Sequence, residues 1–207
     1  MVLKEVFYEL VFQYTDREEI VNRLWKEISD NYSESKRYYH NLEHLDKLLE
    51  ELTNIKDKLE DWNTILFSLF YHDIIYNATR KDNEKRSAEL AIERMMEIGV
   101  EEVIIESTKL HILATKSHSI AINSDTNYFT DADVSILGYD WEVYSKYFLA
   151  VRKEYKVYPN VVYKAGRKKV LNHFLAMERI FKTDYFYDRY EKRAKENMNK
   201  ELALIDS

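Results

Sequence analysis

The chain has 207 residues, of which 45% are hydrophobic, with three Gly, one Pro and no Cys. Turns between strands need Gly and Pro, so this composition favours long helices joined by short connections. The absence of cysteine excludes disulfides and thiolate metal sites, which leaves His, Asp and Glu as metal ligands. The formal net charge of −6 argues against nucleic acid and anionic membranes as partners.

We expect a cytoplasmic protein without a signal peptide or a membrane span. Residues 1–10 carry charges at Lys4, Glu5 and Glu9, where a signal peptide would be apolar. The most apolar run, 65–76, is interrupted by His72 and Asp73 and is too short to cross a bilayer.

Apolar residues recur at three- and four-residue steps along most of the chain, which predicts an all-α fold. In chain order, the first expected helix is 2–14. The second begins at the capping motif 15–18 and ends at a connection over 32–37. A third helix is expected over 39–59, and a fourth follows Asp61. A loop at 77–83 precedes a helix that ends at Gly99, a helix over 101–118 and a loop over 119–129. The remaining expected helices are 131–138, 141–158, 167–182 and 185–205. Since no repeat or linker divides the chain, we expect a single-domain helical bundle over 1–207.

His72 and Asp73 follow Leu69 by three and four residues, so the expected helix turns both toward its apolar face. A carboxylate in that position needs a partner, because an unpaired buried charge is costly. A metal ion would meet this need. An ordinary hydrogen-bonded or Arg-paired His-Asp unit would also meet it, and for these two residues alone it is the favoured alternative.

His40 and His44 are spaced by four residues, which would place both imidazoles on one face of the helix expected over 39–59. They are either helix-end histidines that cap or stack, or a metal ligand, His44, beside a second functional histidine. His111 and His118 similarly share a stripe with Thr115, as a polar seam or as further ligands.

Asp133 precedes Ile136 and Leu137 by three and four residues, which turns it toward the apolar face of the helix expected over 131–138. Asp131 lies roughly 200° around that helix from Asp133. Both could instead be acidic residues that complement the N-terminal helix dipole. Taken together, His44, His72, Asp73 and Asp133 are a set that one divalent ion in a bundle core would explain.

The order His…His-Asp…Asp resembles the HD superfamily of metal-dependent phosphohydrolases. The likeness is closest to a branch of stand-alone bacterial proteins predicted to be HD-type phosphohydrolases, and it covers most of the chain. The segments that carry it are 37–44 (Arg-Tyr-Tyr-His-Asn-Leu-Glu-His), 70–76 (Phe-Tyr-His-Asp-Ile-Ile-Tyr), 82–88, 114–118, 131–138, 151–155 and 166–167.

The resemblance implies that His44, His72, Asp73 and Asp133 hold the metal, in a core over about 37–140 on which helices 141–205 pack. The residues His40-Asn41 and His44 are also similar to the His-Asn-x-x-His motif of cyclic-nucleotide phosphodiesterases, which implies that His40 is a general acid. His118, and less directly His111, would serve a second metal as in binuclear members of the superfamily.

We therefore expect hydrolysis of a small, nucleotide-like phosphoester through a metal-activated water that Asp73 orients. The ligand types suit Zn, Mn, Fe, Co or Ni, and permit Mg. The candidate phosphate ligands, each of which could instead form a structural ion pair, are Arg37, Arg80, Lys81, Arg152 and Arg167. The alternatives are an HD-type di-iron oxygenase that also uses His111 and His118, and a non-catalytic module that metal stabilises.

Two further points stay open at the level of sequence. Glu84 fits either a residue that supports the site or a charge at a helix N-terminus. Apolar residues on the terminal helices could face the core or a second subunit, with a homodimer favoured.

Overall fold

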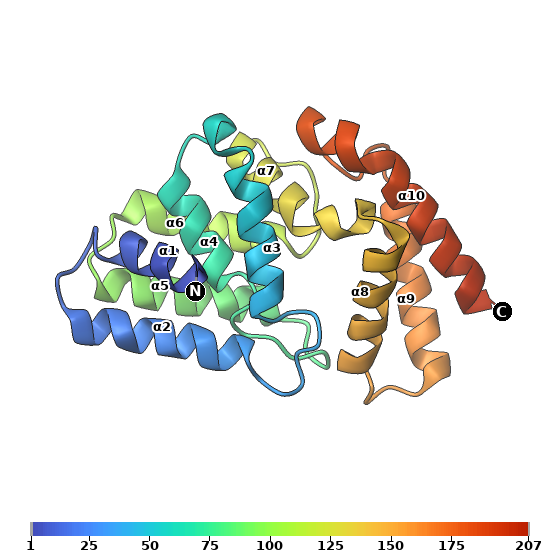
Figure 1. Cartoon of the computed structure of the whole chain (residues 1–207), viewed down its shortest axis with the longest axis horizontal. Helices are drawn as coiled ribbons and strands as arrows, with labels where there is room; N and C mark the ends of the chain where they lie inside the picture. The colour runs from blue at the N-terminus through green and yellow to red at the C-terminus, as the bar shows by residue number, and fades with distance from the viewer. Residues whose placement is uncertain (1, 207) are drawn as a thin grey trace. The chain divides into compact units, whose positions relative to one another are not determined.

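The computed structural model describes residues 2–206, which form helices and contain no strand (Figure 1). This confirms the all-α prediction. The α-helices are α1 (Val2–Val11), α2 (Glu18–Tyr32), α3 (Leu42–Thr53), α4 (Trp62–Tyr71), α5 (Asn83–Glu97), α6 (Glu102–Ala114), α7 (Ser124–Asp133), α8 (Trp141–Glu154), α9 (Asn160–Leu175) and α10 (Asp184–Asp206). Two short 3-10 helices complete them, η1 (Lys56–Lys58) and η2 (Ser135–Gly138).

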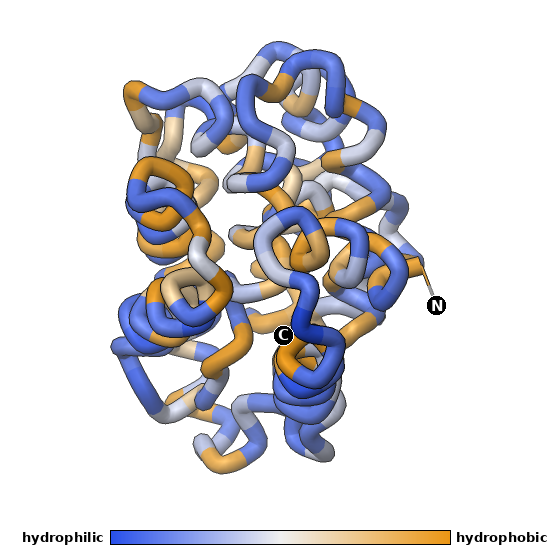
Figure 2. Tube along the Cα trace, turned by 90° about the vertical axis from the view of Figure 1, so that its left-hand side faces the viewer, coloured by the Kyte–Doolittle hydropathy of each residue, from blue (hydrophilic) through white to orange (hydrophobic). Residues whose placement is uncertain are grey.

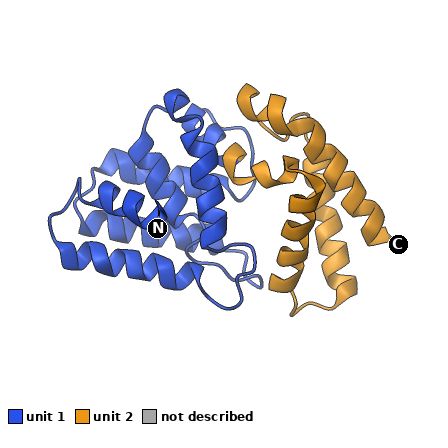
Figure 3. Ribbon diagram, viewed as in Figure 1, with its two compact units in different colours: residues 1–130 blue, residues 131–207 orange. Residues whose placement is uncertain are grey.

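These helices group into two compact units, one that ends at Thr130 and one that begins at Asp131 (Figure 3). The boundary falls within α7, whose last turn carries Asp133. The single domain over 1–207 and the core over 37–140 stay predictions. Among residues 2–206, no helix combines the length and the apolar character that crossing a membrane requires.

Helix α4 is the centre of the first unit, where it packs against α1, α3, α5 and α6. Residues 64–71 are all buried, as expected of a helix that is apolar on every side. Its Phe70 meets Phe7 of α1 edge to face, with ring centroids 5.0 Å apart. Figure 2 shows hydrophobic and hydrophilic segments mixed along the helical turns of the chain, as expected of amphipathic helices. This packing fixes the end of α4, where His72 and Asp73 follow.

The helix predicted over 39–59 begins only at Leu42, because Asn41 caps it. The Asn41 side-chain oxygen accepts hydrogen bonds from the backbone N–H groups of Glu43 and His44, at 3.0 and 3.3 Å. His40 therefore precedes the helix. The prediction that His40 and His44 share one helix face is wrong, since only His44 is helical.

Helix α7 occupies part of the predicted loop 119–129, so that prediction is also wrong. The Asn123 side chain accepts from the Thr126 N–H at 3.0 Å and starts the helix. The buried Asp125 carboxylate accepts from the backbone N–H groups of Glu60 and Asp61. Because the polar residues serve as a cap and a tertiary anchor, Asp133 ends a helix instead of opening one.

In the second unit, η2 packs against α10 at a point where only glycine fits. A Cβ added to Gly138 would lie 2.8 Å from the Tyr190 Cα and carbonyl oxygen. Gly166, predicted to precede a helix over 167–182, lies inside α9, and a Cβ there would have nothing within 4 Å.

The two glycines give a matched pair of stability predictions. Gly138→Ala is expected to lower the free energy of unfolding by about 3 kcal/mol, because Tyr190 backbone atoms cannot yield as a flexible side chain would. Gly166→Ala is expected to raise it by about 0.5–1 kcal/mol, because alanine is the better helix former at an open position. Urea unfolding followed by circular dichroism measures both, and equal effects of the two changes would contradict the packing at Gly138.

Candidate metal centre

His44 lies in the first turn of α3, where the Asn41 cap fixes the backbone that carries it. Its side chain is buried, at 6% exposure, and its ring lies 5.0 Å from that of Tyr39. The imidazole is therefore held in one region by both the cap and the neighbouring ring.

His72 lies at the end of α4, and its two ring nitrogens have different partners. Nδ1 is 3.0 Å from the Leu69 carbonyl oxygen, an acceptor, so Nδ1 carries the proton and donates it. In the neutral imidazole the Nε2 lone pair is then the one that can accept a hydrogen bond or bind a metal ion. This Nε2 lies 3.1 Å from Nε2 of His44. Fixing the tautomer through the second nitrogen is how proteins prepare a histidine to bind metal.

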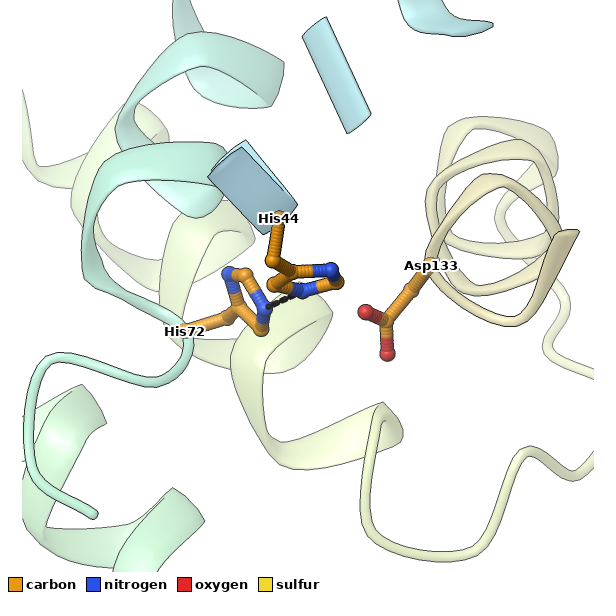
Figure 4. A group of neighbouring side chains, drawn as sticks. All are labelled: His44, His72 and Asp133. Atoms are coloured by element: carbon orange, nitrogen blue, oxygen red, sulfur yellow. Dashed lines mark hydrogen bonds between the residues drawn. The ribbon is translucent and has the colours of Figure 1, made fainter. Parts of the chain in front are cut away.

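His44, His72 and Asp133 each offer one ligand atom, and these atoms lie within 4.8 Å of one another (Figure 4). With metal–nitrogen bonds of about 2.0–2.1 Å, two neighbouring ligand nitrogens on one ion lie about 2.8–3.4 Å apart. The distance of 3.1 Å between the His44 and His72 Nε2 atoms fits that range. The three residues could hold a metal ion, and that they bind one together with Asp73 stays a prediction.

Asp73, the fourth predicted ligand, lies beside these three residues, and its role as a metal ligand stays a prediction. Its Oδ2 is 3.2 Å from His72 Nε2 and 4.0 Å from His40 Nε2. Burial would raise the pKa of the Asp73 carboxyl, but the imidazoles of His72, His40 and His44 hold it well below its usual range. The carboxylate is therefore ionised and faces two histidines.

His111 lies in a separate polar pocket. The Ser68 hydroxyl donates to the Thr64 carbonyl oxygen, so its oxygen accepts from His111 Nδ1 at 3.2 Å. His118 follows the end of α6 with a φ of 50°, so it is not on the helical stripe that the sequence suggested. The second-metal role of both histidines stays a prediction.

Burial gives His111 an expected effect on stability at low pH. Desolvation lowers the pKa of this imidazole to about 4, against an upward influence of Asp125 and Asp61. Between pH 6.5 and 4 the unfolded chain binds a proton that the folded one does not, so stability falls as pH decreases through that window. The loss is expected to reach about 2–3 kcal/mol near pH 4.5, and His111→Gln removes it. Urea unfolding at pH 7 and 4.5 measures the difference, and equal pH slopes for both proteins would contradict it.

The five predicted phosphate ligands each contact different partners. Arg80 pairs with Asp82, and the Lys81 carbonyl accepts from Lys116. Arg152 donates to the carbonyls of Tyr155 and Tyr158 just after α8.

The two remaining arginines are buried. Arg167 forms a two-point ion pair with Glu201, and Arg37 donates to backbone carbonyls near His40 and Asp73. Substrate binding by any of the five stays a prediction.

The structure separates the two acidic residues near the end of α7. Asp131 is fully buried, and its carboxylate accepts from Lys182 and from Thr183 in the second unit. Asp131 is therefore bonded within the second unit, while Asp133 offers a ligand atom within 4.8 Å of those of His44 and His72. The helix over 131–138 from which the inward orientation of Asp133 was inferred does not form, because α7 ends at Asp133 and η2 follows. Glu84, left open by the sequence, lies 3.3 Å from Lys116 Nζ.

Sequence reasoning missed the aromatic support of the site. The Tyr76 ring stacks on that of His40 at 4.1 Å, and the Tyr32 hydroxyl accepts from the Asp73 N–H at 3.2 Å. Tyr76 lies in the 70–76 segment that carries the resemblance, and this position was the sequence signal that could have indicated its role.

Comparison with protein-family models, with curated proteins and with solved structures finds no match for this chain.

Proposed function

We propose that this chain is a metal-dependent phosphohydrolase of the HD type that acts on a small, nucleotide-like phosphoester. The supporting observation is the state of His72, whose Nδ1–H is committed to Leu69. Its Nε2 then faces His44 Nε2 at 3.1 Å and the Asp73 carboxylate at 3.2 Å. The ligand atoms of His44, His72 and Asp133 lie within 4.8 Å of one another, so one divalent cation could bind all three, with Asp73 beside it.

Such an ion, when bound, lets water act as hydroxide near pH 7 and offsets charge on a phosphoryl oxygen. Asp73 is ionised and adjacent, which suits it to orient the attacking water by accepting its hydrogen bond. His40 is partly exposed, with Nε2 4.0 Å from Asp73 Oδ2, which suits it to hold a proton for the leaving oxygen. Asp73 and His40 would thus take the two proton-transfer roles of hydrolysis, one at the attacking water and the other at the leaving oxygen.

The test is turnover of a phosphoester panel by metal-free protein reloaded with Mn, Zn, Co, Fe, Ni or Mg. The panel holds p-nitrophenyl phosphate, bis(p-nitrophenyl) phosphate, nucleoside mono-, di- and triphosphates, and cyclic nucleotides. We expect hydrolysis only in the metal-loaded protein. His40→Ala is expected to lower kcat about 10²- to 10⁴-fold while metal affinity stays unchanged.

Stoichiometric metal without turnover of any panel member would overturn the hydrolase proposal and favour the non-catalytic module. Consumption of dioxygen by the iron-loaded protein would favour the oxygenase. Among residues 2–206 no contact of His111, one of its extra ligands, favours that alternative, because the His111 ring bonds to Ser68.

A further inference from the structure

Arg37 binds the two segments of the chain that carry the proposed proton-transfer pair. Its guanidinium Nη1 donates to the carbonyl oxygens of His40 at 3.2 Å and of Asp73 at 2.6 Å, and its Nη2 donates to that of Ile74 at 2.7 Å. His40 precedes α3 and Asp73 follows α4, so neither backbone is fixed by helical hydrogen bonds. The arginine supplies the bonds that the helix ends lack.

The same guanidinium lies over two aromatic rings. Its central carbon is 4.9 Å from the centroid of the Tyr32 ring and 5.6 Å from that of Tyr76. Tyr76 in turn stacks on the His40 ring at 4.1 Å with an interplanar angle of 25°. The order Tyr32, Arg37, Tyr76, His40 therefore links the end of α2 to the imidazole plane.

We propose that Arg37 is a positioning residue that sets the geometry of His40 and Asp73 and does not bind substrate. The inference rests on the proposed function for the roles of that pair. The Arg37 side chain is 2% exposed, so a phosphate would have to displace both the aromatic rings and the backbone carbonyls to reach it. Lysine cannot replace it, since an ammonium lacks the planar fork that serves several carbonyls while it stacks.

The experiment compares Arg37→Ala and Arg37→Lys with the wild-type chain by proton–carbon NMR of the histidine rings. The Tyr76 ring current shifts the His40 ring signals, and we expect this shift to shrink in both variants. Guanidinium ion added at millimolar concentration should restore it in Arg37→Ala, where it fits the vacated space, and not in Arg37→Lys. In the metal-loaded protein, kcat of both variants should fall about 100-fold with little change in KM. Added guanidinium should restore kcat in Arg37→Ala.

Arg94→Ala is the matched control. This arginine also holds two helices of the first unit together, through a two-point ion pair with Glu27 at 2.8 and 2.9 Å. It should lower stability and leave the His40 signals unchanged.

Unchanged His40 signals in both Arg37 variants, or a raised KM at constant kcat, would overturn the proposal and restore Arg37 as a substrate ligand. If Arg37→Ala does not fold, the Arg37→Lys signals decide between the same outcomes. The ring signals and their rescue require no substrate, so a wild-type protein without turnover would count against the proposed function alone.

Discussion

Arg167→Met is expected to lower the free energy of unfolding by about 3–5 kcal/mol, the cost of leaving a buried charge without its partner. Arg167 and Glu201 have side chains only 6% and 3% exposed, and they meet through two hydrogen bonds of 2.8 and 2.9 Å. The Tyr144 hydroxyl also donates to Glu201. Burial opposes the charged form of Arg167, yet Tyr147 and Glu201 raise its pKa. The pair thus persists as ions within the second unit.

The double variant Arg167→Met/Glu201→Gln separates the value of the pair from the cost of breaking it. The neutral amide that Glu201→Gln introduces still accepts the Tyr144 hydroxyl bond and leaves no buried charge, so the double variant is expected to recover most of the stability that Arg167→Met loses. Urea unfolding of the wild type, both single variants and the double variant completes the cycle. A stable Arg167→Met protein with a raised KM for a phosphoester would contradict this and support the substrate role that the sequence suggested.

Arg167 illustrates what the sequence left unresolved. Its partner Glu201 lies 34 residues further along the chain, and no local pattern pairs them. A basic residue in a segment that resembles a phosphohydrolase is naturally interpreted as a phosphate ligand. Arg167 is buried, however, and its guanidinium pairs with Glu201. The same holds for Arg37, whose acceptors are backbone carbonyls that carry no sequence signal.

The all-α fold was predictable because hydrophobic periodicity depends on burial of one helix face, a property that sequence displays directly. Helix ends were predictable where a side chain forms the cap, as at Asp61. The loop predicted over 119–129 failed because Asn and Asp favour loops locally, while here Asn123 caps α7 and Asp125 anchors it to α4. Tertiary hydrogen bonds overrode a local preference.

The candidate site was predictable in its residue types and not in its local geometry. Spacing from Leu69 turned His72 toward the core, and His72 is 1% exposed. The stacking of His40 on Tyr76 and the tautomer of His72 depend on contacts that periodicity does not describe. The chemistry inferred for each histidine follows from those contacts.

Asp133→Asn is expected to weaken binding of a transition-metal dication at least about 100-fold, since loss of residues that only support a ligand already costs 10–100-fold. The amide keeps the shape of the side chain and removes the negative charge that a cation needs. Because Asp133 is partly exposed, stability of the metal-free protein should change little. His72→Ala should abolish binding, since it removes an imidazole whose tautomer is already set.

Asp131→Asn provides the matched comparison two residues away. Its buried carboxylate accepts from Lys182 and Thr183, so the change should lower stability by several kcal/mol and leave metal affinity unaltered. Elemental analysis and calorimetric titration of metal-free protein with Zn or Co, beside urea unfolding, separate the two effects. His173→Ala, at an exposed position of α9, should change neither. If Asp133→Asn and wild type bind metal equally, then Asp133 is not a ligand. If neither wild type nor any variant binds metal, His44 and His72 are a pair that shares a proton, and the hydrolase proposal loses its basis.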